Sequence, residues 1–292
     1  MKLLIQPDDG ASPVLDAVEQ AESSIDLYVF RLAYPKLKRA LGDAVLRGVS
    51  VRALIAHTNG RGETPLRKLE SELLEMGVTV SRTDEELLRY HGKAMIFDRA
   101  TLYVLGYNFT RRDIEGSRSL GLATRQKSLV TEALRLFEAD FDRQLYTPRL
   151  DQLVVSPYNS RAALLSLIEK ARKRLLIYDP RLTDNLMQRA IERRALSGVE
   201  VRVIGKVEKK LRNVEVAAYP SGRMHVRAIV QDARRVFIGS QGLRRAELDR
   251  RREIGVIVDH KDIVRGVTQV FEHDWADTPQ ARRSRKAKAP KK

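Results

Sequence analysis

His91-Gly92-Lys93-Ala94-Met95-Ile96-Phe97-Asp98 and His225-Val226-Arg227-Ala228-Ile229-Val230-Gln231-Asp232 carry the same spacing of histidine, cation and carboxylate twice in one chain. The two stretches are 134 positions apart (225 − 91). Upstream, Gly48-Val49-Ser50-Val51-Arg52 recurs as Gly198-Val199-Glu200-Val201-Arg202, shifted by 150 (198 − 48). Self-similarity at this length indicates duplicated domains, because solenoid repeats have periods of roughly 20–50 residues. We therefore expect one fold, present twice.

The change of shift from 150 to 134 places 16 surplus residues (150 − 134) in the first copy. They must lie between Val51 and His91, within residues 57–88 or so. We expect an ordinary surface helix in this segment, with a lid over a cleft as the alternative, because insertions usually sit on surfaces. Downstream the shift stays at 134, so that Phe137, Asp140 and Phe141 match Phe271, Asp274 and Trp275.

Composition excludes several classes of protein. The 292 residues are 43% hydrophobic, which is enough to bury a full core. There is no cysteine, which excludes disulfides, thiolate nucleophiles and zinc-cysteine sites. No apolar run approaches the roughly 20 residues of a membrane span, and a proline and two aspartates interrupt the first apolar residues before a signal-peptide core can form. The predicted location is the cytoplasm, with peripheral contact at a membrane as a further expectation.

The formal net charge is +16, of which +7 comes from residues 282–292 and +9 (16 − 7) from the rest of the chain. Such a surface favours polyanions, either nucleic acid or an anionic bilayer. We expect a first half at residues 1–148, a second half at 149–279 and a basic disordered tail at 280–292 that contacts an anionic membrane or nucleic acid. A solvated positive face without a partner is the alternative.

Apolar spacing predicts alternating strands and helices, which is typical of an α/β fold. In the first half the expected strands cover residues 3–6, 24–30, 49–56, 78–80, 94–97 and 102–105. The expected helices cover residues 13–21, 36–47, 65–76 and 131–146, and Gly48 ends the second of them. The second half repeats the order, with strands at 153–155 and 175–178, and helices at 161–170 and 185–197 before Gly198.

The motif has a chemical interpretation of its own. If it lies on a strand, His91 and Lys93 share one face, as do His225 and Arg227. An imidazole beside a fixed cation suits a phosphate group, since the imidazole attacks or donates a proton and the cation holds the oxygens. Duplication supplies a second imidazole on the opposite side of the same phosphorus, as in-line displacement requires. Two matched copies therefore predict one shared phosphate site.

These residues resemble those of the phospholipase D superfamily, whose members carry paired HKD motifs. The similar pattern is His-x-Lys, four residues and Asp, with Gly-Ser and Asn further on, and the resemblance extends over residues 1–276. It implies two tandem α/β/α sandwich halves related by a pseudo-twofold axis. It also implies one active site between the halves of a single chain, a covalent phosphohistidine and no cofactor or metal.

The resemblance assigns a role to each matching position. His91 becomes the nucleophile and His225 the general acid, although the family pattern allows the reverse. Lys93 and Arg227 neutralise the phosphate oxygens. The other catalytic candidates are Asp98, Asn108, Asp232 and Ser240. The two aspartates are expected to anchor structure rather than to carry protons.

A further family feature is a glutamate that orients a histidine through its ring. Glu253 fits this feature and lies 28 residues after His225 (253 − 225). The same step from His91 reaches Ser119, which cannot hold an imidazolium as a carboxylate does. We therefore expect Glu253 to serve His225 and the site around His91 to be the less well supported one.

The motif identifies the bond that is cleaved but not the molecule. The predicted function is a metal-independent phosphodiesterase of phospholipase D type that cleaves or transfers phospholipid head groups. A nuclease is the first alternative, since four arginines follow the motifs and could line the cleft: Arg111, Arg112, Arg244 and Arg245. A catalytically impaired polyanion-binding protein is the second, because Ser119 and Arg227 depart from the family pattern.

Overall fold

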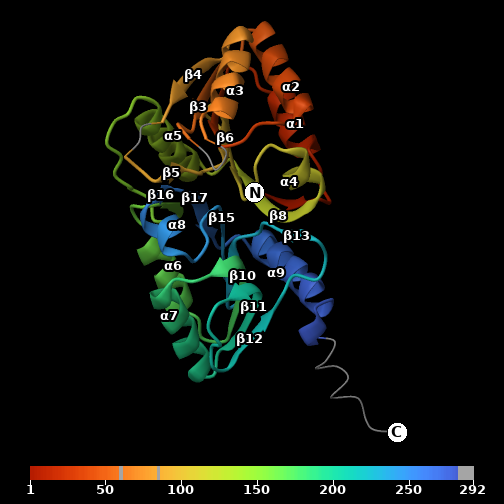
Figure 1. Cartoon of the computed structure of the whole chain (residues 1–292), viewed down its shortest axis with the longest axis vertical. Coiled ribbons are helices and arrows are strands. Elements are labelled where there is room, and N and C mark those ends of the chain that lie inside the picture. Colours follow the sequence, from red (N-terminus) through yellow and green to blue (C-terminus); the bar gives the residue numbers. More distant parts are fainter. Residues whose placement is uncertain (59–61, 84–85, 282–292) are drawn as a thin grey trace.

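The computed structural model describes residues 1–58, 62–83 and 86–281. The expected tail at 280–292 lies almost entirely outside these residues, as do short pieces of the surplus segment. Figure 1 shows two α/β halves stacked along the long axis of the molecule, the first above the second. The predicted α/β class, with two tandem halves, is confirmed.

The first half is built on a mixed sheet. Its seven-strand path runs β1-β8-β7-β6-β2-β3-β4, in which β2, β3 and β4 are parallel and the others antiparallel. The strands are β1 (Lys2–Gln6), β2 (Ser24–Val29), β3 (Ser50–Ile55), β4 (Thr79–Arg82), β6 (Ala94–Phe97), β7 (Thr101–Leu105) and β8 (Ser117–Thr124). The helices are α1 (Ser12–Glu19), α2 (Pro35–Leu46), α3 (Thr64–Glu75), α4 (Arg111–Glu115) and α5 (Lys127–Phe141).

The second half repeats this sheet. Its strand order is β12-β11-β10-β14-β15-β17-β9, which is the order of the first sheet read from its other edge. The strands are β9 (Leu153–Val155), β10 (Arg174–Leu182), β11 (Glu200–Val207), β12 (Val214–Ala217), β14 (Ala228–Gln231), β15 (Arg235–Gly239) and β17 (Ile254–Val258). The helices are α6 (Ser160–Glu169), α7 (Asn185–Leu196), α8 (Arg245–Asp249) and α9 (Lys261–Ala276).

Local backbone conformation explains where the helices end. Gly48 and Gly198 follow α2 and α7 with φ of +88° and +90°, which a side chain would disfavour, so both predicted helix ends are confirmed. The expected helix at 131–146 stops earlier, at Phe141. Arg143 there adopts a φ of +56°, which is incompatible with continuing the helix. Tyr146 instead packs in the core and donates a hydrogen bond to Glu132 (2.7 Å).

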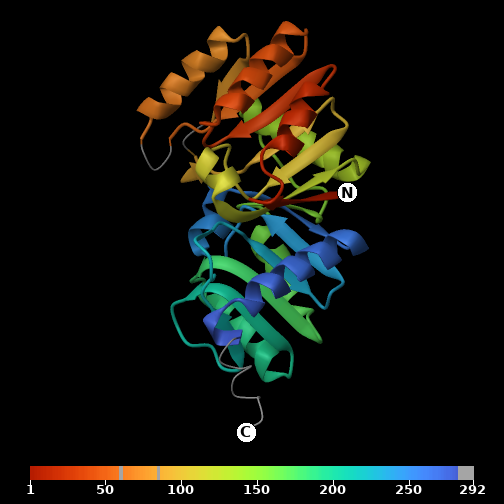
Figure 2. The same ribbon diagram turned by 90° about the vertical axis from the view of Figure 1, so that its right-hand side faces the viewer.

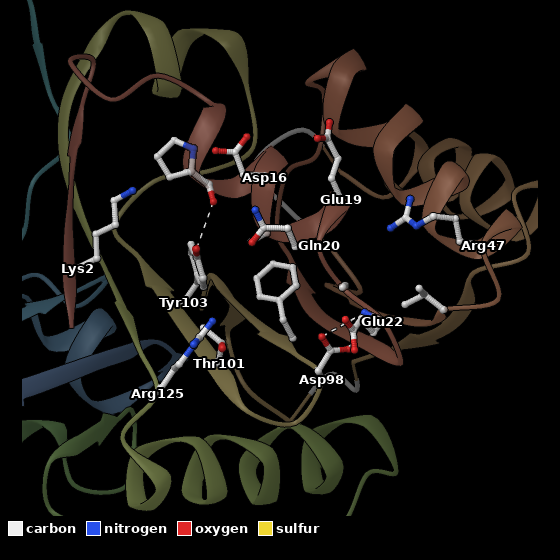
Figure 3. Close-up of a pocket in the computed structure, with 15 residues that line it drawn as sticks. Lys2, Asp16, Glu19, Gln20, Glu22, Arg47, Asp98, Thr101, Tyr103 and Arg125 are labelled. Carbon is white, nitrogen blue, oxygen red and sulfur yellow. Dashed lines mark hydrogen bonds between the residues drawn. The ribbon is translucent and has the colours of Figure 1, made fainter.

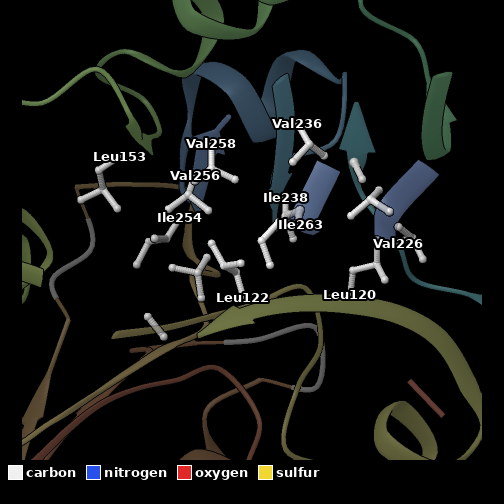
Figure 4. Packing of buried hydrophobic residues seen from close by; sticks show 14 of the residues in the cluster. Leu120, Leu122, Leu153, Val226, Val236, Ile238, Ile254, Val256, Val258 and Ile263 are labelled. Atoms are coloured by element: carbon white, nitrogen blue, oxygen red, sulfur yellow. The ribbon is translucent and has the colours of Figure 1, made fainter. Parts of the chain in front are cut away.

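Three hydrophobic clusters hold the layers together. Residues of α1, α2 and α3 cover the outer face of the first sheet, and residues of α6 and α7 cover the outer face of the second. The cluster between the sheets draws on both halves, with Leu120 and Leu122 packing near Val236, Ile238 and Ile254 (Figure 4). Helices α5 and α9 belong to this shared cluster. The side view in Figure 2 again shows the first half above the second. The halves are thus fused through one core.

The surplus segment contains α3, which has no equivalent between β11 and β12. One face of α3 is buried, through Leu66, Leu69 and Leu73, while Leu74 is exposed. The expected helix in this segment is confirmed. It makes the first half larger than the second on the outer side of β3 and β4 (Figure 1).

Two short strand pairs cross between the halves. β5 (Arg89–Tyr90) pairs in parallel with β16 (Arg251–Arg252), and β13 (Arg223–Met224) pairs in the same way with β8. Just beyond them, the His91 backbone N–H donates to Arg252 O (2.7 Å) and the His225 N–H donates to Arg118 O (2.8 Å). The expectation that the histidines and cations lie on strands was wrong. They occupy the links between β5 and β6 and between β13 and β14. In each link the chain leaves a short strand paired with the opposite half and enters the sheet of its own half.

A buried ion pair stands beside each crossing. Arg252 donates to both carboxylate oxygens of Asp140 in α5 (2.8 and 3.0 Å), and Tyr28 donates to the same carboxylate (3.2 Å). The duplicate set joins Arg118 to Asp274 in α9 (3.2 Å), with Tyr178 donating to Asp274 (2.6 Å). Each arginine comes from one half and each aspartate from the other, so the pairs fix how the halves meet.

Replacing Asp140 by alanine tests this anchor. Asp140→Ala leaves the buried Arg252 guanidinium without its charge partner, so we expect the free energy of unfolding to fall by about 3–5 kcal/mol. Asp262→Ala is the control, because its pair with Arg265 is exposed and such pairs contribute less than about 1 kcal/mol. Denaturant unfolding of both variants measures the difference. Equal losses in the two would contradict an anchoring role.

Candidate active site

His91 is held by a carboxylate from the opposite half. Its Nδ1 lies 2.9 Å from Glu253 Oε2, and its ring meets Phe30 edge to face with centroids 4.5 Å apart. Glu253 was expected to serve His225, which was wrong. The β5–β16 pairing carries Glu253 across the interface to His91, because Glu253 directly follows β16. The site around His91 is therefore the better supported of the two.

His225 has the opposite environment. Its Nδ1 is buried without a hydrogen-bond partner. Ser119, which occupies the position equivalent to Glu253, donates from Oγ to the His225 backbone carbonyl at 3.5 Å and does not engage the ring. One imidazole is thus held by a carboxylate at Nδ1, and the other has no hydrogen bond at the same atom.

Burial and surrounding cations keep both rings neutral. The pKa of His91 is held well below its usual value, first by burial and then by the charges of Lys93 and Arg227. The pKa of His225 is also held well below its usual value, by burial and by Arg227, with partial relief from Asp113. Lys93 and Arg227 come from different halves, yet each acts on both histidines. The duplicated motifs therefore share one electrostatic environment.

The motif cations are themselves buried. The Lys93 ammonium donates to the His91 carbonyl and lies 5.3 Å from the centre of the Phe30 ring. Burial lowers the pKa of Lys93 to about 7, against the opposing effect of the Glu253 carboxylate. Arg227 donates from Nε to Glu247 (3.2 Å), and its Nη1 is buried without a partner. Donors without partners in a buried site suit an anionic ligand.

Asn108 and Ser240 lie close to the motifs and support the backbone there. Asn108 donates from Nδ2 to Asp113 (2.6 Å), which in turn accepts from Arg223. Ser240 accepts from the backbone N–H of Ile254 (3.1 Å), the residue after Glu253. Both residues therefore brace the segments that carry the site.

The four predicted cleft arginines differ in their placement. Arg244 is partly buried and pairs with Glu247, close to Arg227. Arg112 lines a cavity together with Arg223. Arg111 is 84% exposed and pairs with Glu115, and Arg245 is exposed as well. The structure thus brings Arg244 to the site and Arg112 to an adjoining cavity, whereas Arg111 and Arg245 are not brought to the site.

Sequence reasoning missed two symmetric sets of site residues. Asp113 and Glu247 occupy equivalent positions (247 − 113 = 134), and each pairs with an arginine beside a histidine. Arg89 and Arg223 precede the two histidines by two residues and form the crossing strands. The 134-residue shift, applied to every charged residue instead of to the motif alone, would have found both sets.

Asp98 and Asp232 lie away from the site. Asp98 accepts from the backbone N–H groups of Glu22, Ser23 and Ser24, at the start of β2, and these bonds lower its pKa although burial opposes them. Asp232 does the same for residues 172–174 before β10. Asp98 instead lines a broad hollow of about 960 Å³ on the first half, beside Glu22 and Arg47 (Figure 3). Both aspartates are structural anchors, and their assignment to the catalytic set is corrected.

The described residues contain neither a metal-binding cluster nor a membrane-spanning helix. In residues 1–58, 62–83 and 86–281, no group of three or more histidine, aspartate or glutamate side chains is arranged to hold a metal ion. Over the same ranges, no helix combines the length and apolar character needed to cross a bilayer.

Comparisons with known proteins agree with this geometry. A family model described as cardiolipin synthase, PLD-like domain, matches residues 14–141 and 164–275, one segment in each half. The mitochondrial cardiolipin hydrolase of Mus musculus is 31% identical over 140 residues, which are 47% of this chain and 58% of that protein. The chain thus matches little more than half the length of this curated relative.

Solved structures share the fold. Polyphosphate kinase from Porphyromonas gingivalis has a TM-score of 0.78 at 21% identity, over 93% of this chain and 46% of that one. Phosphatidylserine synthase from Haemophilus influenzae has a TM-score of 0.70 at 11% identity, over 94% of this chain and 86% of that one. At these identities the similarity establishes the fold alone.

The lowered pKa of Lys93 predicts pH-dependent anion binding. Because this pKa is about 7, raising the pH from 6 to 8 removes the proton and reduces the charged fraction about tenfold. We expect the affinity for dimethyl phosphate, whose single charge is constant over this range, to fall by a similar factor in calorimetric titration. Lys93→Arg keeps its charge and should remove the dependence. An identical pH dependence in that variant would exclude Lys93 as the titrating group.

Proposed function

The chain belongs to the family of the PLD-like domain of cardiolipin synthase, within the phospholipase D superfamily, and we propose that it cleaves or transfers phospholipid head groups through a covalent phosphohistidine. The observation that carries this proposal is the hydrogen bond between His91 and Glu253 across the two halves. It supports His91 as the nucleophile. The positive charge that the reaction needs is supplied by Lys93 and Arg227.

The His91–Glu253 contact supports nucleophilic attack for a simple reason. With the carboxylate ionised, the ring proton resides on Nδ1, and Nε2 keeps its lone pair. The low pKa of His91 keeps that lone pair available near neutral pH. After attack the ring becomes positive, and the buried carboxylate stabilises it. His225 has no such partner and is better suited to proton transfer.

In the first step, His91 Nε2 attacks phosphorus and the bond from phosphorus to the head-group oxygen breaks. His225 donates its proton to that oxygen, which leaves as an alcohol. In the second step, water or another alcohol attacks phosphorus and His225 accepts the proton. The N–P bond then breaks, and His91 and the protonated His225 are regenerated.

The low pKa of His225 in the empty site is unfavourable for an acid, and the substrate removes this difficulty. Arg227 is the main charge that disfavours the imidazolium. A bound phosphodiester carries a negative charge that offsets Arg227 and Lys93, so the pKa of His225 rises when the site is occupied. The acid is thus formed in the complex and not in the empty enzyme.

Phospholipid is the favoured substrate because the family model and the curated relative are both described by cardiolipin chemistry. A nuclease is the second candidate. It is favoured by the net charge of +16 and by arginines at the site, which suit a polynucleotide as well as a lipid head group. A binding protein without activity is less consistent with a buried His91 held by a carboxylate and a half-buried His225 that shares its cations.

Cleavage in the presence of EDTA tests the proposal and assigns the histidines. We expect turnover of phosphatidylcholine and of a phosphatidyl p-nitrophenyl ester by the unaltered protein. For His91→Ala, turnover of both substrates should fall by at least about 10³-fold, because no covalent intermediate can form. For His225→Ala, turnover of phosphatidylcholine should fall by about 10²–10⁴-fold, whereas turnover of the p-nitrophenyl ester should be retained, because p-nitrophenolate leaves without a proton.

A parallel reaction with labelled oligonucleotide at equal phosphate concentration distinguishes the two substrate classes. If His91→Ala instead retained turnover of the ester and His225→Ala lost it, the assignment of nucleophile and acid would be reversed. Full activity of either variant on phosphatidylcholine would disprove a shared site, and faster cleavage of the oligonucleotide would favour the nuclease.

The asymmetry of the two rings gives a matched pair of variants. Glu253→Gln keeps the shape of the side chain but removes the charge that stabilises the His91 ring, so we expect kcat to fall by about 10–100-fold with KM nearly unchanged. Ser119→Ala, at the equivalent position, should change kcat less than about threefold. Steady-state kinetics on folded variants, checked by circular dichroism, measure both. Comparable losses in both variants would contradict the proposed division of roles.

A further inference from the structure

A cationic cavity lies next to Asp113 and Arg223, two charged residues close to His225. It encloses about 300 Å³ and is lined by residues from four places: the link after β2, the helix α3, the segment around α4 and the strand β13. Its cations are Arg31, Arg112 and Arg223. Its apolar wall comprises Leu32, Ala33, Pro65, Leu66 and Leu69. A small cavity with one charged and one apolar wall suits a small phosphorylated alcohol.

The cavity adjoins the side of the site that holds His225. Asp113 lines it, and the same carboxylate acts electrostatically on the His225 ring. Arg223 lies two residues before His225 and pairs with Asp113. In the proposed reaction His225 protonates the departing alcohol, so this cavity is positioned to receive the leaving group.

Two of the three arginines retain their charge for a ligand. Arg31 and Arg112 form no ion pair within residues 1–58, 62–83 and 86–281, whereas Arg223 is neutralised by Asp113. The Arg31 Nε is buried without a hydrogen-bond partner, and its guanidinium lies 5.6 Å from the centre of the Phe30 ring that contacts His91. A cation fixed in this way disfavours a neutral or positive leaving group and favours an anionic one.

The second half has no equivalent cavity wall. Arg181 is the counterpart of Arg31 (181 − 31 = 150), but it is 61% exposed and pairs with Glu208 (2.8 Å). Helix α3, which supplies Leu66 and Leu69, belongs to the surplus segment and is absent from the second copy. The cavity is therefore specific to one end of the pseudo-symmetric cleft and gives the substrate a direction.

We propose that this cavity is a leaving-group subsite for a second phosphate, so that the preferred substrate is a phospholipid whose head-group alcohol is itself phosphorylated. The proposal rests on the proposed function for the orientation of the leaving group. Arg31 and Arg112 bind the second phosphate, and the leucines of α3 contact the carbon atoms of the alcohol. A nucleic acid fits less well, because none of the residues lining the cavity is aromatic and a base has no stacking partner there.

Two lipids that differ only in the leaving group test the subsite. Phosphatidylglycerol phosphate and phosphatidylglycerol, in micelles of the same nonionic detergent, release glycerol phosphate and glycerol. We expect the full chain to prefer the former by about tenfold in kcat/KM, as one charge-assisted contact would give. Arg31→Ala should bring this ratio close to one, and Arg31→Lys should restore part of it. Arg181→Ala is the matched control and should keep the ratio.

A calorimetric titration with glycerol 3-phosphate separates failure of the subsite from failure of the proposed function. If neither lipid is cleaved, the proposed function fails. Binding of glycerol 3-phosphate that is about tenfold weaker in Arg31→Ala, but unchanged in Arg181→Ala, would still support the subsite. Absence of any Arg31-dependent binding would overturn it.

Where the lipids are cleaved, an equal rate on both by the unaltered protein would also overturn the subsite. So would a preference that survives in Arg31→Ala. A dinucleotide with and without a terminal phosphate is run alongside. An Arg31-dependent preference confined to the dinucleotide would overturn the assignment to lipid.

Discussion

The bidentate ion pair between Arg252 and Asp140 is the contact on which the site depends, together with its duplicate between Arg118 and Asp274. Arg252 is anchored to the opposite half, and its backbone carbonyl accepts the N–H of His91. The next residue is Glu253, which faces the His91 ring. Because the anchor Arg252 and the orienting carboxylate Glu253 are consecutive residues, the register of β16 against β5 is closely fixed. A slip of one residue would separate Glu253 from His91 and bury an unpaired guanidinium.

A symmetric scaffold here carries an asymmetric site. The equivalent positions hold Glu253 in one copy and Ser119 in the other, so only His91 receives a carboxylate. At another pair of equivalent positions, a difference in one residue is offset by a difference in its neighbour. Gly242 stands opposite Asn108, and a Cβ at Gly242 would lie 2.5 Å from Glu247 Oε2. Glu247 is one methylene longer than Asp113 and occupies the space that the amide of Asn108 fills in the first half, so both copies keep an acid beside an arginine.

Sequence could predict the duplicated fold and the paired motifs, because repeats and apolar spacing are local signals. It could not predict which histidine Glu253 serves. A separation of 28 residues places Glu253 near a strand end, but the β5–β16 crossing exchanges these strand ends between halves, and only the tertiary structure fixes that exchange. The segment that Asp98 anchors was unpredictable for a related reason, since its role in the turn before β2 depends on backbone N–H groups some 75 residues away. Arg31 could not be found from a sequence motif, because the cavity that it lines forms only where α3 packs beside it.

The electrostatics of the site depend on the state of occupancy. Without ligand, buried cations from both halves hold the pKa of each histidine down, and the pKa of Lys93 itself falls to about 7. The empty site thus minimises its own charge, as desolvation requires. An entering phosphodiester opposes the loss of charge at Lys93 and His225, because its negative charge favours their protonated forms. With Glu253 ionised, the Nδ1–H of His91 donates a hydrogen bond to it, and the lone pair remains on Nε2. In the proposed mechanism, binding therefore creates the acid and preserves the nucleophile, although both are imidazoles of a repeated motif.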